Sequence, residues 1–361
     1  MGPVNFVALA AVTSNGEWVA FEGRLLRGLP ALAGESLSSL ELAEAVSLAV
    51  RPVVAHDALR LMGNNPDGVG HTVFSFWHNF ETEFGRQFMQ SYLAGKDPCL
   101  PADLIRQTMP AGLVGTGHGK RDLLARQLFD AHGVGGELRV LLRDVRGVWG
   151  SLALLRSAGG RAFDRTDAAR VLELAPVLIS ALRQYVRSGP MRPVAPDMAP
   201  GVFVVDADGN VTGATPMASW WAERLREHHP SSWVDALVAG MAAQTRLCLR
   251  QPAAPAPVMH GPAARFGRWI SAEGQLLNPG GAVAVLVRAV PPRQLLGSLG
   301  SWYGITARER QVIEYLLDGS AAKQIARHLD VSLHTVHDHL KSVYRKLGVS
   351  GRAELLTALN T

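Results

Sequence analysis

The sequence has few of the residues that covalent and metal chemistry require. Its 361 residues include two cysteines, Cys99 and Cys248, which lie far apart, each without a second cysteine nearby. A disulfide framework and a zinc site of paired cysteines are therefore excluded, and we expect no metal or other cofactor. No Ser/His/Asp set or pair of carboxylates can be assigned to catalysis from the order of residues. We expect that the protein is not an enzyme.

Long hydrophobic runs are also missing. No stretch approaches the roughly 18 uncharged apolar residues that a membrane-spanning helix requires. The start of the chain, MGPVNFVALA, lacks the basic residues of a signal peptide. With 47% hydrophobic and 19% charged residues, the composition is that of an ordinary water-soluble protein. We expect a cytoplasmic protein with no membrane partner.

Proline-rich segments divide the chain. At roughly 100 to 200 residues per domain, two or three domains are expected. Residues 188–201, SGPMRPVAPDMAPG, contain four prolines, which is typical of an extended linker. A shorter break, VPPRQ, begins at Val290. We predict domains over residues 1–188, 201–290 and 298–361, with a linker over 189–200.

The first block has the order helix, hairpin, hairpin, helix. Ser38 and Glu41 form a capping box at the start of the first helix. ALRLMG and HTVFSFWH are strand-like runs joined by turn residues, and ELRVLLRD and VWGSLALLR flank a turn at residues 145–147. The last helix is predicted to begin after Asp164 and to kink at Pro176.

This order resembles a GAF domain over about residues 36–187, most closely at ELRVLLRDVRGVWGSLALLR and AFDRTDAARVLELAPVLISAL. The resemblance implies a central antiparallel sheet with helices against it, often around a pocket for a small molecule. Trp77, Arg139 and Trp149 are the candidates to line that pocket, and a plain core role is the alternative for them. SYLAGKDP, which includes Tyr92 to Pro98, is faintly similar to acyl-homoserine-lactone receptors and keeps an autoinducer receptor open.

The second block opens with GVFVVDADGNVTGATPMASWWAERL, two strand runs around a turn at residues 206–210, followed by a helix from Ala218. GRWISAEGQLLNPGGAVAVLVRAV closes it as another strand pair. The opening resembles the start of a PAS domain, with Thr215 where that family often has Asn. A PAS-like α+β module is the expectation.

The last block is predicted to form four helices. Thr306 and Glu309 are spaced as a capping box, and Gly319 ends the first helix. SAAKQIARHL is a short second helix, and DVS is a tight turn in which Ser332 caps a third helix, residues 333–347. GRAELLTAL is the fourth. The side chains expected to face inward from the third helix are Val336, Leu340, Val343, Tyr344 and Leu347.

A helix, a tight turn and a basic second helix are typical of the DNA-binding helix-turn-helix. Over about 55 residues the pattern closely resembles the LuxR-type family. The matching residues are Thr306, Arg308, Glu309, Gly319, Lys323, Ile325, Ala326, Leu329, Ser332, Thr335, Val336, His339, Lys346 to Val349, and Arg352. Gln324 and His337 depart from the usual pattern. The resemblance implies a homodimer joined through the final helix, with Leu355, Leu356 and Leu359 as candidate contacts.

The third helix carries three histidines, but they do not form a metal site. At about 100° per residue, His337 and His339 point to opposite sides and cannot share a metal with His334. Between residues 319 and 352, six basic residues stand against two acidic ones, a surplus of four, while the whole chain has a net charge of +5. The outward face of the third helix is therefore suited to DNA, and a solvated charged face is the alternative.

The resemblance implies a division of these residues between bases and phosphates. His337, Asp338 and Lys341 are the candidates for base edges in the major groove. The candidates for phosphate contacts are Lys323, Thr335, Arg345, Lys346 and Arg352. We predict a multidomain α+β protein that ends in an all-α DNA-binding domain and regulates transcription at promoters, with N-terminal domains that sense a signal. A GAF/PAS interaction scaffold is the alternative class.

Overall fold

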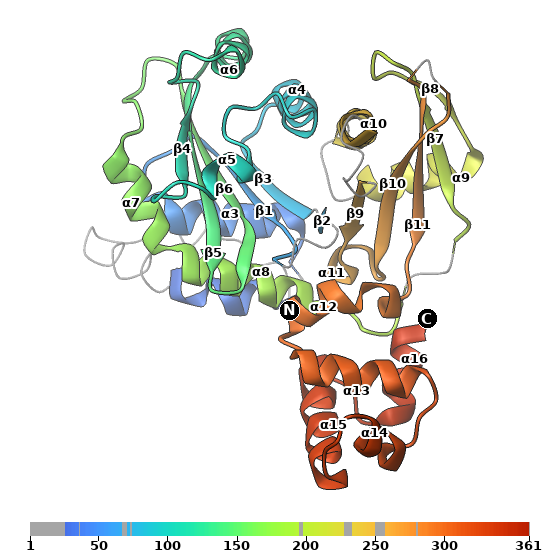
Figure 1. Cartoon of the computed structure of the whole chain (residues 1–361). Helices are drawn as coiled ribbons and strands as arrows, with labels where there is room; N and C mark the ends of the chain where they lie inside the picture. The colour runs from blue at the N-terminus through green and yellow to red at the C-terminus, as the bar shows by residue number, and fades with distance from the viewer. Residues whose placement is uncertain are drawn as a thin grey trace.

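The computed structural model describes residues 26–35, 37–66, 71–72, 74–194, 198–226, 233–249, 257–278 and 281–360. Figure 1 shows two β-sheets side by side, with a helical domain below them. The start of the chain, on which the signal-peptide prediction was made, lies outside the described residues, as does part of the predicted linker. Within the described residues, no helix is both long and apolar enough to cross a bilayer.

The first module contains a five-stranded antiparallel sheet of order β3-β1-β6-β5-β4. Both predicted hairpins are present, as the pairs β1/β3 and β5/β6. Its strands are β1 (Ala58–Gly63), β3 (Phe74–His78), β4 (Ala111–Val114), β5 (Val134–Asp144) and β6 (Gly147–Ser157). Its helices are α3 (Ser39–Val50), α4 (Thr82–Leu93), α5 (Pro101–Leu104), α6 (Lys120–Ala131), α7 (Arg165–Glu173) and α8 (Ala175–Ser188).

Capping residues set where these helices begin. Ser38 Oγ accepts from the amide of Glu41, and the Glu41 carboxylate accepts from the amide of Ser38, so the predicted capping box is confirmed. Asp164 caps α7 as predicted. The single kinked helix expected after it is instead two helices, which meet at Leu174, with Pro176 in the first turn of α8. Proline is tolerated there because first-turn amides have no partner within the helix.

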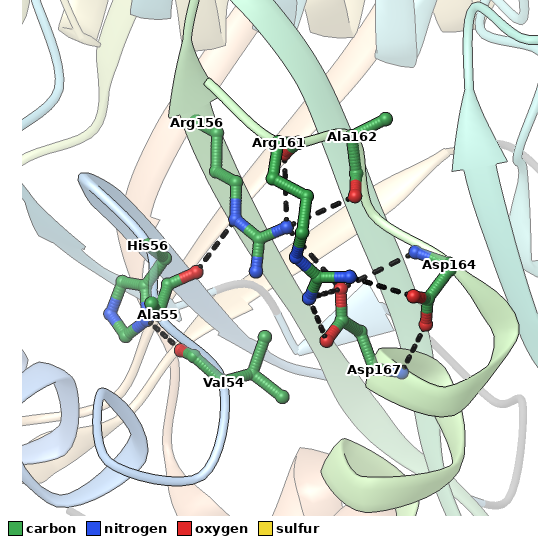
Figure 2. Close-up of polar contacts among 8 residues, drawn as sticks. All are labelled: Val54, Ala55, His56, Arg156, Arg161, Ala162, Asp164 and Asp167. Atoms are coloured by element: carbon green, nitrogen blue, oxygen red, sulfur yellow. Dashed lines mark hydrogen bonds and ion pairs between the residues drawn. The ribbon is translucent and has the colours of Figure 1, made fainter.

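Arg156 at the end of β6 ties three segments together (Figure 2). Its guanidinium donates to the carbonyl oxygens of Ala55, Arg161 and Ala162 at 2.8, 3.1 and 3.2 Å, and it pairs with Asp167 at 3.3 Å. The carboxylate of Asp167 is buried and also accepts from Arg161. The loop before β1 and the start of α7 are therefore held against the sheet.

The second module has a six-stranded sheet of order β2-β9-β10-β11-β7-β8. Its first strand, β2 (His71–Thr72), comes from the first block and runs parallel to β9. The predicted strand HTVFSFWH is therefore divided, because its first residues join this sheet and its last residues join the other. The remaining strands are β7 (Gly201–Val205), β8 (Val211–Ala214), β9 (Val258–Gly261), β10 (Ile270–Leu276) and β11 (Val283–Ala289). The helices are α9 (Pro216–Arg226), α10 (Trp233–Leu249) and α11 (Ala263–Phe266).

Two helices join the modules. In Figure 1, α4 and α10 lie against each other between the two sheets. A Cβ atom at Gly240 of α10 would lie 2.1 Å from a methyl carbon of Leu93 in α4, so the close approach of these helices requires glycine there. The first two predicted blocks thus share both a sheet and a helix pair.

A short connection leads to the C-terminal domain. It consists of the 3-10 helix η1 (Pro292–Leu295) and α12 (Leu296–Tyr303). Trp302 of α12 is fully buried, with its ring 5.2 Å from that of Trp149 and 5.7 Å from that of Phe74. The four helices of the last domain follow: α13 (Ala307–Leu317), α14 (Ala322–His328), α15 (Leu333–Leu347) and α16 (Arg352–Asn360). One apolar core extends from the first sheet through α12 into this domain.

Candidate nucleic-acid interface

Local signals position the helices of the C-terminal domain as predicted. Thr306 Oγ1 accepts from the amide of Glu309 at 3.2 Å, and the Glu309 carboxylate accepts from the amide of Thr306 at 2.7 Å. Ser332 Oγ accepts from the amide of Thr335 at 3.0 Å and caps α15. Gly348 ends α15 with a φ of 70°, in the left-handed region that favours glycine.

The α15 helix has one apolar and one polar face. On the inward face Val336, Leu340, Val343 and Leu347 are buried and Tyr344 is half-buried, which confirms the predicted stripe. On the other face, exposed residues recur at helical spacing and Ser342 beside them is half-buried. These exposed residues are His337, Asp338, Lys341 and Arg345. At about 1.5 Å per residue, the 15-residue helix is about 22 Å long, enough to lie across a major groove.

The three histidines have different surroundings. His334 and His337 are exposed, and His339 is half-buried. His334 Nε2 lies 3.4 Å from the Asp338 carboxylate one turn along, which makes an ion pair when the imidazole is protonated. In the part of the chain that the structure describes, no three His, Cys, Asp or Glu side chains are grouped to hold a metal ion.

The predicted phosphate contacts fall into two groups. Lys323 and Arg345 are exposed, and Thr335 shares a hydrogen bond with the capping hydroxyl of Ser332 at 2.8 Å. Lys346 Nζ instead contacts both carboxylate oxygens of Glu309, at 2.8 and 2.6 Å. Arg352 donates to the carbonyl oxygen of Ser320 at 3.1 Å. Lys346 therefore joins α15 to α13, and Arg352 joins α16 to the loop after α13.

Glu309 is the acidic partner inside the domain. Burial opposes ionisation of its carboxyl, but hydrogen bonds from Lys346, from the Thr306 amide and from Ser342 outweigh that effect and lower its pKa to about 2. The side chain of Glu309 is 4% exposed, and that of Lys346 is 23% exposed. This pair joins the start of α13 to the end of α15 and so sets the angle at which α15 is presented.

The residues of the final helix lie mainly inside the chain. Leu355 and Leu359 are completely buried, and Leu356 is half-buried. The α16 helix lies against η1, and Arg293 donates to the side chain of Asn360 at 3.1 Å. In this conformation Leu355 and Leu359 belong to the chain's own core and are not available to a partner.

Sequence reasoning missed Leu333. Its side chain is 43% exposed at the first position of α15, among the larger exposed apolar side chains of the described residues. It lies four residues before His337 and eight before Lys341, so the three side chains follow one line along the helix. The available signal was an apolar residue at the leading end of an otherwise polar face.

The three predicted pocket residues do not come together. Trp77 and Arg139 lie on the face of the first sheet that α4 covers. The guanidinium of Arg139 lies over the ring of Phe88 in α4, and the ring of Trp77 lies under the guanidinium of Arg60 in β1. Trp149 lies in the core on the opposite side, against Trp302 and under the guanidinium of Arg183. A register shift in the β5/β6 pair next to Trp149 accounts for the change of side. The grouping of Trp149 with the other two is therefore wrong.

Comparisons with known proteins give matches in the C-terminal domain. Residues 304–359 match the family model described as bacterial regulatory proteins, luxR family. The spore germination protein GerE of Bacillus subtilis is 40% identical over 55 residues, which are 15% of this chain and 74% of that protein. The monoamine regulon transcriptional regulator of Klebsiella aerogenes is 42% identical over 53 residues, 15% of this chain and 23% of that protein. The match therefore spans less than a quarter of the latter.

A solved structure of Escherichia coli SdiA aligns with 92% of this chain and 94% of that chain, at 11% identity and a TM-score of 0.35.

Proposed function

Because the chain belongs to the luxR family of bacterial regulatory proteins, we propose that it binds promoter DNA in a sequence-specific manner and regulates transcription. The observation that carries this proposal is the exposed polar stripe of α15, opposite a buried apolar stripe on the same helix. A helix built in this way can lie in a major groove while its other face holds it to the domain. A cytoplasmic location, where DNA is accessible, is part of the proposal.

The base contacts are assigned to the exposed stripe. We assign base-edge contacts to His337, Asp338 and Lys341, because Lys can donate to guanine O6 and N7 and Asp can accept from cytosine N4. Leu333 extends the same line, and an apolar side chain there suits the methyl group of thymine.

Phosphate contacts are assigned to Arg345, at the end of this stripe, and to two residues outside it. Lys323, Thr335 and Arg345 keep this role because two of them are exposed cations and the third lies at the start of α15. Lys346 and Arg352 were also candidates, but their hydrogen bonds support a positioning role, with α13 and with the loop after α13. Any phosphate contact by either residue would compete with these bonds.

The proposed DNA-bound form is a homodimer on an inverted repeat, with half-sites about one helical turn apart. The α16 helix remains the proposed dimer surface, with Leu356 as the contact that is not fully buried. Leu355 and Leu359 could take part only if α16 moved from its place against η1, since both are now covered.

The N-terminal modules are proposed to act as the sensor. The support is the burial of Trp302 between Trp149 and Phe74, together with the hydrogen bond from Tyr303 Oη to the carbonyl of Val186 at 3.4 Å. Trp302 and Tyr303 belong to α12, and only the short segment that begins at Gly304 separates α12 from α13. A change in the first sheet would therefore be transmitted to α13 through α12.

Capture of sheared genomic DNA from the source organism by the full-length protein tests the proposal. Wild type should enrich fragments that share a short inverted repeat, and Lys341→Ala should lose this enrichment while remaining folded. Arg170→Ala is the matched control, because Arg170 is an exposed cation on α7, in the first module. Equal enrichment by wild type and Lys341→Ala would contradict the assigned role of α15.

A further inference from the structure

Two arginines are buried on the face of the first sheet that α4 covers. Arg60 of β1 is 0% exposed and Arg139 of β5 is 1% exposed. Both lie opposite Ala153 of the intervening strand β6. With strands about 4.8 Å apart, their Cα atoms are about 10 Å from each other, and the rings of Phe88 and Tyr92 contact both guanidinium groups. Two like charges thus share one closed face of the sheet.

The two guanidinium groups are satisfied to very different degrees. Arg139 donates to the carboxylates of Asp97 at 2.6 Å and Glu137 at 2.7 Å, and to the carbonyl of Cys99 at 3.0 Å. Arg60 donates through Nη1 to the thioether of Met89 at 3.5 Å. Its Nε and Nη2 atoms are buried without a hydrogen-bond partner. The acidic groups act on Arg60 only at longer range.

Aromatic rings surround Arg60 but do not replace the missing acceptors. Its Cζ atom lies 4.5 Å from the ring centre of Phe88, 5.4 Å from that of Tyr92 and 5.5 Å from that of Trp77. Burial and the positive charge of Arg139 lower its pKa to about 10, so the group stays charged at neutral pH. Cation–π contacts stabilise a buried cation, but an unpaired buried N–H remains unfavourable.

We propose that Arg60 anchors a binding site for a small monocarboxylate with a flat apolar body, as in an aromatic acid. The two unpartnered atoms, Nε and Nη2, form the side of the guanidinium that takes a carboxylate through two parallel hydrogen bonds. A ligand carboxylate would give Arg60 the direct pairing that Asp97 and Glu137 give Arg139. The rings of Trp77, Phe88 and Tyr92 offer the apolar body an aromatic wall.

A ligand at this place has a direct route to α12. Trp77 and Phe74 both belong to β3, on opposite faces of the sheet, and Phe74 contacts Trp302. A shift of β3 on binding would therefore act on both sides. This inference rests on the proposed sensor role of the first module, but its test needs no DNA.

Thermal unfolding of the full-length protein tests the site. Benzoate and phenylacetate are added to wild type, to Arg60→Met and to the control Arg170→Met, with sodium chloride and sodium sulfate at matched ionic strength. At about a hundred times its dissociation constant, a bound carboxylate should raise the midpoint of wild type and of the control by roughly 5 °C. Arg60→Met should show no rise with either carboxylate.

A second measurement separates a binding role from a structural one. Methionine removes the unpaired buried donors and keeps much of the side-chain volume, so Arg60→Met without ligand should unfold at the same or a higher temperature than wild type. A lower midpoint would mean that Arg60 is a structural cation held by the rings, and would overturn the proposal. So would a wild type that responds to neither carboxylate, or that responds equally to chloride or sulfate. DNA capture is measured in a separate experiment, so failure of carboxylate binding and failure of DNA binding can be told apart.

Discussion

Replacement of Lys346 by Met distinguishes a helix-positioning lysine from a phosphate-binding one. Lys346 Nζ contacts both oxygens of the nearly buried Glu309 carboxylate, 37 residues away along the chain. Methionine keeps the length of the side chain and removes its charge and its donors. Glu309 would then be left buried without its cation, and we expect the contact between α13 and α15 to weaken at neutral pH.

The pKa of Glu309 sets the magnitude. It is about 2 in the folded chain and 4.5 for an ordinary glutamate. At about 1.36 kcal/mol per pKa unit, the difference corresponds to a contribution of at most about 3 kcal/mol to stability. The folded-state pKa is depressed, so this contribution is present above pH 4.5 and is lost as the pH falls toward 2. Loss of one partner of a buried pair costs a similar amount, about 3 to 5 kcal/mol.

Hydrogen exchange of the full-length protein, followed by mass spectrometry, measures the stability of α13 and α15 separately from the rest of the chain. A local measurement is needed because several domains need not unfold together. At pH 7, amides of α13 and α15 in Lys346→Met should exchange about a hundredfold faster than in wild type. The difference should shrink as the pH is lowered below 4.5, after correction for intrinsic rates. Adding Glu309→Gln should restore much of the protection, because the amide oxygen can still accept from Thr306. The exposed Lys323→Met is the control.

Unchanged exchange in Lys346→Met at pH 7, together with weaker DNA binding, would refute the reasoning and return Lys346 to the phosphate contacts. Faster exchange that persisted undiminished near pH 2 would also contradict it, since Glu309 would then be protonated in the variant and about half protonated in wild type.

Three further predictions concern DNA and the link between modules. Lys341→Ala should weaken operator binding by about 1 to 3 kcal/mol and relax base preference. Lys323→Ala should weaken binding to all DNA sequences alike and reduce the slope of log affinity against log salt concentration by about 1. Binding titrations at several salt concentrations check both. Leu333→Ala should bind thymine and uracil versions of the operator equally, whereas wild type should prefer thymine in competition assays. Trp302→Ala should destabilise the first module by about 3 to 5 kcal/mol, measured by urea unfolding; a loss below about 1 kcal/mol would mean that α12 is not packed in its core.

Features that depend on neighbouring residues could be predicted from the sequence. The capping boxes at Ser38 and Thr306 and the cap at Ser332 are hydrogen bonds between residues three apart. The inward stripe of α15 follows from the helical period alone. The exposed stripe of α15 could be predicted for the same reason, because the polar residues between the apolar positions of a helix fall on its opposite face.

Features that depend on distant residues could not be predicted in the same way. The strand HTVFSFWH reads as continuous, yet its first residues pair with β9 of another module. Lys341 and Lys346 are equally suited to DNA as far as the sequence shows, because both are lysines of the basic third helix. Only the fold brings Glu309 next to Lys346. Trp149 and Trp77 both read as strand aromatics, and the register shift in the β5/β6 pair places Trp149 on the opposite face of the sheet from Trp77.

Local sequence signals are enough to identify the helix-turn-helix of the luxR type and the polar face of α15, because helix caps, helical period and turn residues act within one or two turns. Long-range packing is what places Lys346 and Arg352 in support of the domain, buries Trp302 in the first module, and buries Arg60 with two unpaired donors. These outcomes depend on which helix or strand packs against a side chain from far along the chain, and no spacing in the sequence records that choice.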